Sequence, residues 1–174
     1  MADGFQVPFD ACEDVRKYTD EQTVEDVFTF RLHRLTAISE RAAQICGQSS
    51  FDLSLNEWRL LALVKSRAPT RAGGLADILL MDKSQTSRVT KSLLNKRLIR
   101  SFPDPDDGRA IALEPTDEGL LLYHRIFEDV IRSNEMLLDV LSAEEVQLLD
   151  SILGKLTERG SDLLEALLAR PLLR

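Results

Sequence analysis

Residues 75–88 read Leu75-Ala76-Asp77-Ile78-Leu79-Leu80-Met81-Asp82-Lys83-Ser84-Gln85-Thr86-Ser87-Arg88, and this stretch decides the fold. Its first half carries apolar residues at helical spacing, and Thr70 can cap the short helix that they predict. Asp82 and Gln85 form an acceptor-x-x-Gln cap, which opens a second helix that should continue to about Arg97. The two helices meet across a very tight turn, which is the arrangement of a helix-turn-helix.

A short β-hairpin is predicted directly after these helices. Residues 98–102 carry a short alternating apolar pattern, residues 103–108 concentrate Asp, Pro and Gly, and residues 110–113 resume the apolar pattern. A turn-rich segment between two short apolar segments is typical of a hairpin. Pro115 ends the second strand, so the helix-turn-helix and the hairpin are neighbours in the chain.

Two helices are predicted before this region. Apolar residues from Val24 onward recur at steps of three, four and seven, which predicts a helix of about 25 residues that ends near Gly47. Ser54 and Glu57 form a capping box for a following helix of about twelve residues, which stops before Pro69.

Two further helices are predicted after the hairpin. Thr116 can cap a long helix that continues to about Val140, with acidic residues in its first turn, where they favour the helix dipole. Ser142 and Glu145 form another capping box, and apolar residues follow at helical spacing. Gly160 either breaks this last helix or permits a close helix crossing.

The charge of the chain is unevenly distributed. The 174 residues include 22 Lys and Arg against 29 Asp and Glu, and the net charge of -7 by itself argues against a nucleic-acid partner. Between Lys65 and Arg100, however, nine basic residues stand against Asp77 and Asp82, so this segment carries +7. The remaining 13 basic and 27 acidic residues carry -14. A basic stretch alone is usually a solvated helix surface, but its coincidence with a helix-turn-helix and a hairpin favours a winged helix that binds duplex DNA.

The second helix of the helix-turn-helix has side chains that can read DNA. Gln can make two hydrogen bonds to adenine and Arg two to guanine, while Ser and Thr can bond to several bases and to phosphates. A polar, well-capped helix start explains Ser84 and Gln85 equally well when each is taken alone. The candidate DNA contacts on this helix are Lys83, Ser84, Gln85, Thr86, Ser87, Arg88 and Lys91.

Other functions lack their sequence signatures. There is no phosphate loop, dinucleotide glycine fingerprint, zinc-protease pair or nucleophile elbow, so we do not expect an enzyme. Only two His are present and no His, Cys and carboxylate cluster has ligand spacing, so we expect neither a metal nor a cofactor. An acidic helical protein-interaction adaptor without DNA binding is the alternative function, although an adaptor has no need of a concentrated positive segment.

The cellular compartment is predicted from composition. No window approaches the roughly 18 to 20 consecutive apolar residues of a membrane helix, and the first thirty residues carry eight acids without an apolar signal-peptide core. Cys12 and Cys46 are too few for a disulfide framework, which fits a reducing compartment. We therefore expect a cytoplasmic protein without a membrane partner, in which the two cysteines are plain thiols or, less favoured, redox sensors.

The sequence resembles the MarR (multiple-antibiotic-resistance regulator) family of bacterial winged-helix repressors. The order of elements matches from about residue 20 onward, and the combination of motifs is far more specific than any one of them. The motifs are Leu75-Ala76-Asp77-Ile78-Leu79 with Asp82-Lys83-Ser84-Gln85-Thr86-Ser87-Arg88, then Leu93-Leu94-Asn95-Lys96-Arg97-Leu98-Ile99-Arg100, then Asp104-Pro105-Asp106-Asp107-Gly108-Arg109, and finally Leu113-Glu114-Pro115-Thr116-Asp117-Glu118-Gly119.

The resemblance implies a mainly α fold with a small β-hairpin wing. It implies an irregular arm at 1–19, a helical dimerisation region at 20–48 and 117–174, and a winged helix-turn-helix lobe at 49–116. The terminal helices carry more apolar surface than one small lobe can cover, which agrees with a two-fold interface. The implied protein is a homodimeric repressor of a pseudo-palindromic operator, with half-sites about one helical turn, roughly 34 Å, apart.

The resemblance also assigns a role to the wing. In the family a wing Arg enters the minor groove, where a narrow groove attracts a slender cation, and a nearby Asp orients it. Asp107 and Arg109 match these positions. Gly108 stands where many relatives have a second Arg, so this wing carries less charge than usual, and residues 106–108 are also compatible with a simple turn.

Family members often release DNA when a small, commonly anionic aromatic ligand binds between the dimer helices and the DNA-binding lobe. Aromatic and cationic side chains would suit such a ligand. For each candidate a structural role in the core or at the surface is the alternative, with Trp58 packing at a helix start and Tyr123 in the core. The candidate ligand contacts are His33, Trp58, Arg59, Tyr123 and His124.

Overall fold

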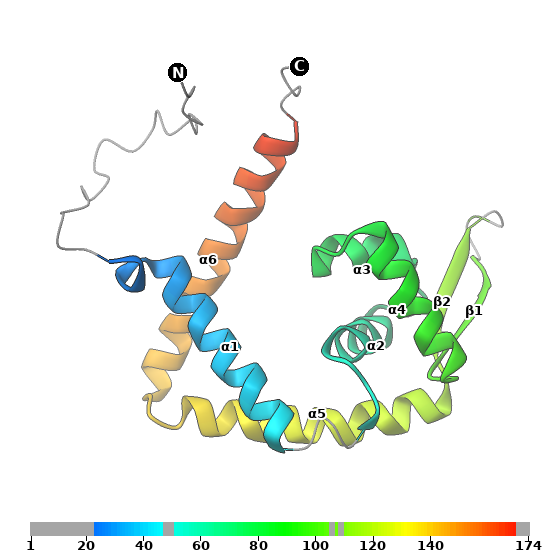
Figure 1. Cartoon of the computed structure of the whole chain (residues 1–174), viewed down its shortest axis with the longest axis horizontal. Coiled ribbons are helices and arrows are strands. Elements are labelled where there is room, and N and C mark those ends of the chain that lie inside the picture. Colours follow the sequence, from blue (N-terminus) through cyan, green and yellow to red (C-terminus); the bar gives the residue numbers. More distant parts are fainter. Residues whose placement is uncertain (1–22, 47–50, 105–106, 108–109, 170–174) are drawn as a thin grey trace. The chain divides into compact units, whose positions relative to one another are not determined.

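The computed structural model describes residues 23–46, 51–104, 107 and 110–169. The chain divides into two units, Met1–Cys46 and Gly47–Arg174. The prediction of a mainly α chain with one β-hairpin is confirmed, and Figure 1 shows the two-stranded sheet beside α4 in the second unit. The elements are η1 Val24–Asp26, α1 Phe28–Cys46, α2 Leu55–Arg67, α3 Ala72–Leu79, α4 Lys83–Asn95, β1 Ile99–Pro103, β2 Ile111–Pro115, α5 Asp117–Leu138 and α6 Ala143–Leu168.

In the described part of the first unit, a short 3-10 turn at Val24–Asp26 precedes α1, whereas the sequence predicted one long helix from Val24. Thr23 caps this turn, because its backbone N–H donates to the Asp26 carboxylate at 2.8 Å. Val27 then takes extended backbone angles, with φ -71° and ψ 127°, so α1 starts only at Phe28. The apolar periodicity was continuous across this break, which is why the sequence did not reveal it.

The predicted capping residues start α2, α4, α5 and α6, whereas the prediction that Thr70 caps α3 was wrong, because the residue before α3 is Arg71 and its side chain makes no capping hydrogen bond. The side chains of Ser54, Asp82, Thr116 and Ser142 each accept a hydrogen bond from the backbone N–H three residues later, which satisfies a donor that the helix itself leaves unpaired. Helix α6 continues without interruption past Gly160, so this glycine does not break it.

Helix α6 contains no buried residue, although its sequence is rich in leucine. Leu149, Ile152 and Leu153 are each about two-fifths exposed, and Leu148 is more exposed still. None of the helices in the described part of the chain is both long and apolar enough to span a membrane.

The hairpin, called the wing below, lies one residue later than predicted at the start of both strands. Strands β1 and β2 are antiparallel, with Ile99 opposite Pro115 and Pro103 opposite Ile111. On its other edge, β2 exchanges two backbone hydrogen bonds with Thr70, since the Thr70 N–H donates to the Leu113 carbonyl at 3.1 Å and the reverse bond is 2.7 Å. The segment before α3 is thereby joined to the wing.

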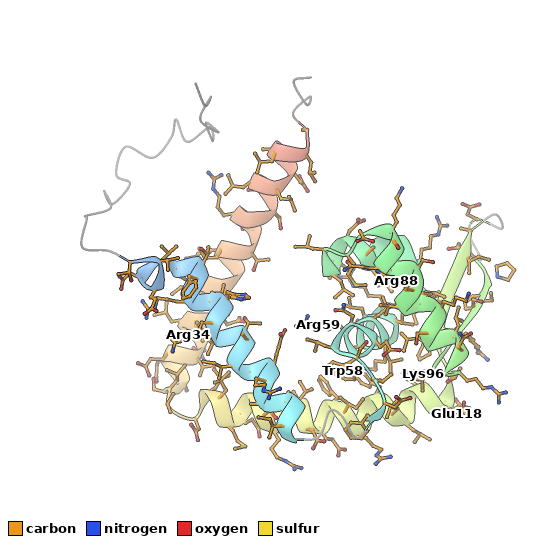
Figure 2. All side chains as sticks on the ribbon, in the orientation of Figure 1. Arg34, Trp58, Arg59, Arg88, Lys96 and Glu118 are labelled. Carbon is orange, nitrogen blue, oxygen red and sulfur yellow. The ribbon has the colours of Figure 1, made fainter. Side chains whose placement is uncertain are left out.

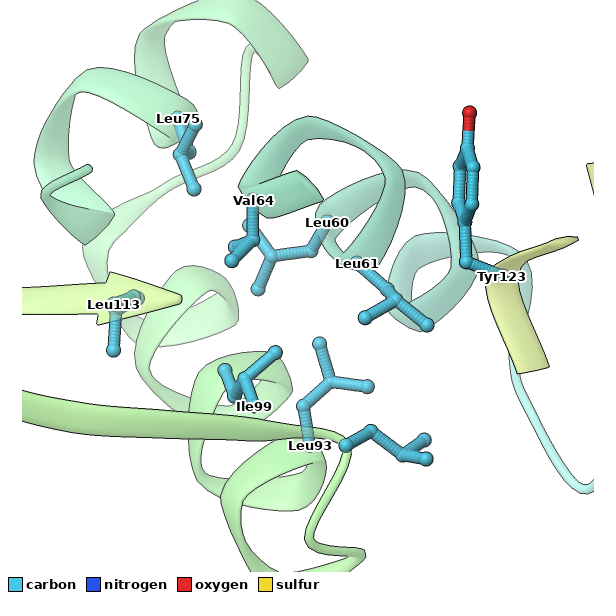
Figure 3. Packing of buried hydrophobic residues seen from close by; sticks show 9 residues of the cluster. Leu60, Leu61, Val64, Leu75, Leu93, Ile99, Leu113 and Tyr123 are labelled. Carbon is cyan, nitrogen blue, oxygen red and sulfur yellow. The ribbon is translucent and has the colours of Figure 1, made fainter. Parts of the chain in front are cut away.

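The core of the second unit draws its buried residues from α2, α3, α4, both strands and α5. Leu60, Leu61 and Val64 of α2 are fully buried at its centre. Figure 3 shows that side chains from α3, α4 and both strands converge on these three. The surrounding buried residues are Leu75, Leu93, Leu98, Ile99, Leu113 and Tyr123. Burial of this apolar surface is the main force that holds the helix-turn-helix against the wing.

Helix α5 starts in close contact with the base of the wing. The Thr116 N–H donates to the Leu98 carbonyl at 3.1 Å, and the Thr116 hydroxyl donates to the Arg97 carbonyl at 2.6 Å. Gly119 packs so near this backbone that a Cβ on it would lie 1.9 Å from the Leu98 oxygen. The Thr-x-x-Gly motif therefore needs glycine at this position, because the backbone of α5 lies too close to that of Leu98 to leave room for a side chain.

We expect Gly119→Ala to destabilise the chain by about 2 to 3 kcal/mol, because the added methyl group forces α5 away from Leu98. Gly73→Ala is the matched control, since a Cβ there meets nothing within 4 Å, and it should stabilise α3 by about 0.5 to 1 kcal/mol. Urea unfolding followed by circular dichroism measures both changes. Equal stability of the two variants would contradict the proposed steric cause.

Candidate nucleic-acid interface

The start of α4 is fixed by hydrogen bonds within its first turn. The Asp82 carboxylate accepts from the Gln85 N–H at 2.7 Å, and the Gln85 side-chain oxygen accepts from the Asp82 N–H at 3.4 Å. Thr86 is only 5% exposed, and its hydroxyl donates to the Asp82 carbonyl at 2.9 Å. Among the predicted DNA contacts, Thr86 is therefore buried and its hydroxyl is already hydrogen-bonded. Gln85 is exposed, but its side chain also caps the start of α4.

The remaining predicted contacts of α4 form one exposed polar surface. Lys83, Ser84, Ser87, Arg88 and Lys91 are all exposed. No carboxylate in the described part of the chain forms a salt bridge with any of the three cations of this group. A helix that presents unpaired cations together with hydroxyl groups suits contact with phosphates and base edges.

Other cations of the basic segment contact carboxylates or an aromatic ring of the protein itself. Arg71 Nε lies 2.6 Å from a carboxylate oxygen of Asp104, and Arg100 pairs with Glu114 on the opposite strand of the wing. Lys65 Nζ lies 5.1 Å from the centre of the Tyr123 ring. The sequence count of +7 therefore overstates the positive charge that is available to a phosphate backbone.

The turn end of the wing is organised by Asp104, which directly follows β1. Its carboxylate accepts from the Asp107 N–H at 3.1 Å and also binds Arg71, which stands immediately before α3. Asp107 is half exposed and lies 3.8 Å from the Arg71 guanidinium. Arg109, the predicted minor-groove residue, lies outside the described residues, as does Gly108. Sequence reasoning missed Arg71 and Asp104 because their pairing joins residues 33 positions apart.

The other end of α4 is held by the buried carboxylate of Glu57. One oxygen accepts from the Ser54 N–H at 2.7 Å, as the capping box requires. The second oxygen accepts from the Ser92 hydroxyl at 2.6 Å and lies 3.2 Å from Lys96 Nζ. Lys96 Nζ also donates to the Asp52 carbonyl. We call this group of Glu57, Ser92 and Lys96 the α2–α4 clamp.

The α2–α4 clamp keeps Glu57 ionised. Burial raises the pKa of Glu57, but the hydrogen bonds from Ser92, Ser54 and Lys96 outweigh burial and lower the pKa from 4.5 to about 2. Glu57 is only 7% exposed, so the ionised carboxylate depends on these partners for its stability.

Three of the predicted ligand contacts lie together in an aromatic cluster. The Tyr123 ring stacks on Trp58, with centroids 5.5 Å apart, and contacts His124 edge to face at 5.2 Å. Phe127 stacks on Tyr123 at 5.2 Å. The sequence could have indicated Phe127, which follows Tyr123 by four residues on α5, and Lys65, which follows Trp58 by seven on α2, because these spacings share a helix face.

The aromatic cluster is closely packed. The cavity beside Trp58 has a volume of about 10 Å³, room for about one water molecule. It is lined by Phe51, Leu53, Ser54, Leu55, Trp58 and Ile126. Arg59 is exposed and has an interaction partner, and the exposed His33 belongs to the first unit.

The first unit has an open hollow of about 350 Å³ that the sequence did not predict. It is lined by Glu25, Asp26, Phe30, Arg31, Arg34, Leu35 and Ile38, and His33 is not among them. Within the described residues, no group of three His, Cys, Asp or Glu side chains could hold a metal ion. Cys12 and the side chain of Cys46 lie outside the described part.

Known proteins share this architecture. Residues 51–110 match the MarR family model. The regulator PecS of Dickeya dadantii, named as a helix-turn-helix transcriptional regulator, is 26% identical over 127 residues, which are 71% of this chain and 76% of PecS. The structure of the S. aureus MepR–DNA complex matches with a TM-score of 0.68 and 18% identity, covering 79% of this chain and 99% of MepR. PcaV of Streptomyces coelicolor, solved with its natural ligand, matches with a TM-score of 0.65 and 19% identity, covering 79% of this chain and 96% of PcaV.

A tight helix-turn-helix, a wing joined to it and an unpaired cationic surface on its second helix define a winged-helix DNA-binding protein. With the family match over residues 51–110, the chain carries the winged helix-turn-helix lobe of the MarR family of transcriptional regulators. The resemblance to the MarR family that the sequence indicated is thus confirmed. The function is that of a DNA-binding transcriptional regulator and not that of the alternative, an adaptor without DNA binding. As a transcriptional regulator the protein is not an enzyme.

We expect the contribution of Glu57 to stability to depend on pH. Its pKa is lowered on folding, so the contribution is complete above about pH 4.5 and is lost as the pH falls towards 2. Between pH 6 and pH 3, the difference in unfolding free energy between wild type and Glu57→Gln should shrink by about 2 kcal/mol. Urea unfolding at both pH values measures it.

The matched control is Glu128→Gln on α5, because Glu128 is exposed. Its difference from wild type should stay constant within about 0.5 kcal/mol over the same range. A Glu57→Gln difference that does not change with pH would show that the carboxylate is not held in its ionised form.

Proposed function

We propose that the protein is a cytoplasmic, homodimeric repressor that binds a pseudo-palindromic operator and is released by a small aromatic or anionic effector. The observation that carries this proposal is the exposed face of α4, where Lys83, Arg88 and Lys91 have no carboxylate partner in the described part of the chain. MepR, which shares the fold, was solved bound to DNA. On this proposal α4 lies in the major groove, with Arg109 of the wing in the minor groove beside Asp107.

The exposed apolar residues of the long helices support the homodimer. A 26-residue helix with no buried residue leaves a large hydrophobic surface in water, which is costly unless a partner covers it. A second copy of the same chain covers it through two-fold symmetry. On this proposal 20–48 and 117–174 form the dimerisation region, 49–116 forms the DNA-binding lobe, and 1–19 is an arm.

The aromatic cluster supports an effector site. Trp58 and Tyr123 offer flat ring faces and Lys65 a nearby positive charge, which would suit an aromatic anion. Because the adjacent cavity is small, the effector would have to displace Trp58, and this would disturb the first turn of α2. Arg59 and His124, which also belong to the second unit, complete the proposed set of contacts. PcaV, a protein of the same fold, was solved with its natural ligand.

Selection of genomic fragments by the purified protein tests sequence-specific binding. The protein should enrich one or a few fragments that contain an inverted repeat, with half-sites about one helical turn apart. Size-exclusion chromatography with light scattering tests the homodimer on the same sample. Enrichment of fragments without a common sequence would contradict the operator.

Salt titration of the selected operator measures the ionic part of binding. If each lobe makes about four phosphate contacts, the logarithm of the binding constant should fall with the logarithm of the salt concentration with a slope near about -7 for the dimer. Fluorescence anisotropy at several salt concentrations measures the slope. A flat dependence would exclude the cationic surface of α4 as the contact.

We expect Arg88→Ala to weaken operator binding by about 1 to 3 kcal/mol, with a smaller effect on a random duplex, because Arg88 lies where it can read a base edge. Arg132→Ala is the control, since Arg132 is an exposed arginine on α5. Anisotropy titrations on both duplexes measure the changes. Equal losses on operator and random DNA would make Arg88 a phosphate contact only.

A further inference from the structure

The α2–α4 clamp contacts α4 near its C-terminal end only. Ser92 and Lys96 are the residues of α4 and its cap that reach Glu57, at 2.6 Å and 3.2 Å. Of the proposed DNA contacts, Lys83, Ser84, Ser87 and Arg88 lie in the first two turns of the same helix, while Lys91 lies next to Ser92. Figure 2 shows Lys96 at the C-terminal end of α4, with Arg88 further along the helix.

The hydrogen bonds of the clamp define the angle between α4 and α2 more closely than the apolar contacts of α4 do. Leu93 is fully buried and Val89 packs against the core, but apolar burial depends on area and has little directional preference. Hydrogen bonds lose strength steeply when their angles change. Both oxygens of Glu57 are engaged, one within α2 and one with α4, so the carboxylate joins the two helices at a defined angle.

The length of α4 magnifies a change at the clamp. From Lys96 back to Gln85 the helix rises about 16 Å at 1.5 Å per residue. A tilt of about 10° at the clamp would move the first turn by roughly 3 Å, which is the length of a hydrogen bond. Contacts to base edges would be lost by such a shift, whereas a flexible Lys or Arg could still reach a phosphate.

We propose that Glu57 is a positioning residue for DNA recognition, which fixes the angle of α4 through Ser92 and Lys96 and so sets how well the lobe distinguishes its operator from other DNA. The inference rests on the proposed sequence-specific binding. Glu57 touches no DNA on this view, and its effect on binding is transmitted entirely through α4.

The test compares Glu57→Gln and Ser92→Ala with wild type on the selected operator and on a random duplex. Each variant should raise the operator Kd by about tenfold, the loss of roughly one good base contact, and change the random-duplex Kd by less than about twofold. The salt slope on each duplex should stay as in wild type, because no phosphate contact is removed. Ser92→Thr keeps the hydroxyl and should restore discrimination.

The control is Ser66→Ala on α2. Among the described residues, the Ser66 hydroxyl bonds only to the Leu63 carbonyl of its own helix, at 3.1 Å, so this change should leave both affinities unchanged. If Glu57→Gln does not fold, the comparison of Ser92→Ala with Ser92→Thr decides the question, since both retain the ionised Glu57. Equal weakening on both duplexes, or an unchanged ratio, would overturn the inference while the proposed function stands. A wild-type protein that prefers no duplex would overturn both.

Discussion

The ionised carboxylate of Glu57, buried between α2 and α4, is the interaction on which the DNA-binding lobe depends. A buried charge is costly unless it is fully paired, and here Ser54, Ser92 and Lys96 together satisfy both oxygens. The neighbouring residue, Trp58, stacks on Tyr123 of α5. The first turn of α2 therefore contacts both α4 and α5, so the same turn fixes the position of both helices.

Local rules explain why much of the fold could be predicted from the sequence. Ser54, Asp82, Thr116 and Ser142 start their helices because capping depends on residues three positions apart, and such spacing is visible in a sequence. The wing was found for a similar reason, from its turn composition. The break at Val27 was missed, since backbone angles there interrupt a helix without interrupting its apolar pattern.

The candidate site was predictable in outline and not in detail. Ser, Thr and Lys in the segment around α4 looked alike in the sequence, yet Thr86 is buried and Lys96 belongs to the clamp. Lys96 differs from the other residues because it pairs with Glu57, 39 positions earlier, and Thr86 differs because it is buried. No local spacing encodes either difference. The net charge predicted for the basic segment was therefore correct as a sum, but part of it is used in ion pairs within the protein. A smaller set of cations on α4 has no carboxylate partner in the described part of the chain.

The contact between Thr70 and Leu113 has a consequence for how the protein behaves at high concentration. A two-stranded hairpin normally exposes unpaired backbone groups along both outer edges, and such edges can add strands from another molecule and start aggregation. Leu113 directs its N–H and its carbonyl to Thr70, which blocks the outer edge of β2 at its centre. The protein can thus expose a hairpin to solvent while one of its edges is closed to β-strand addition.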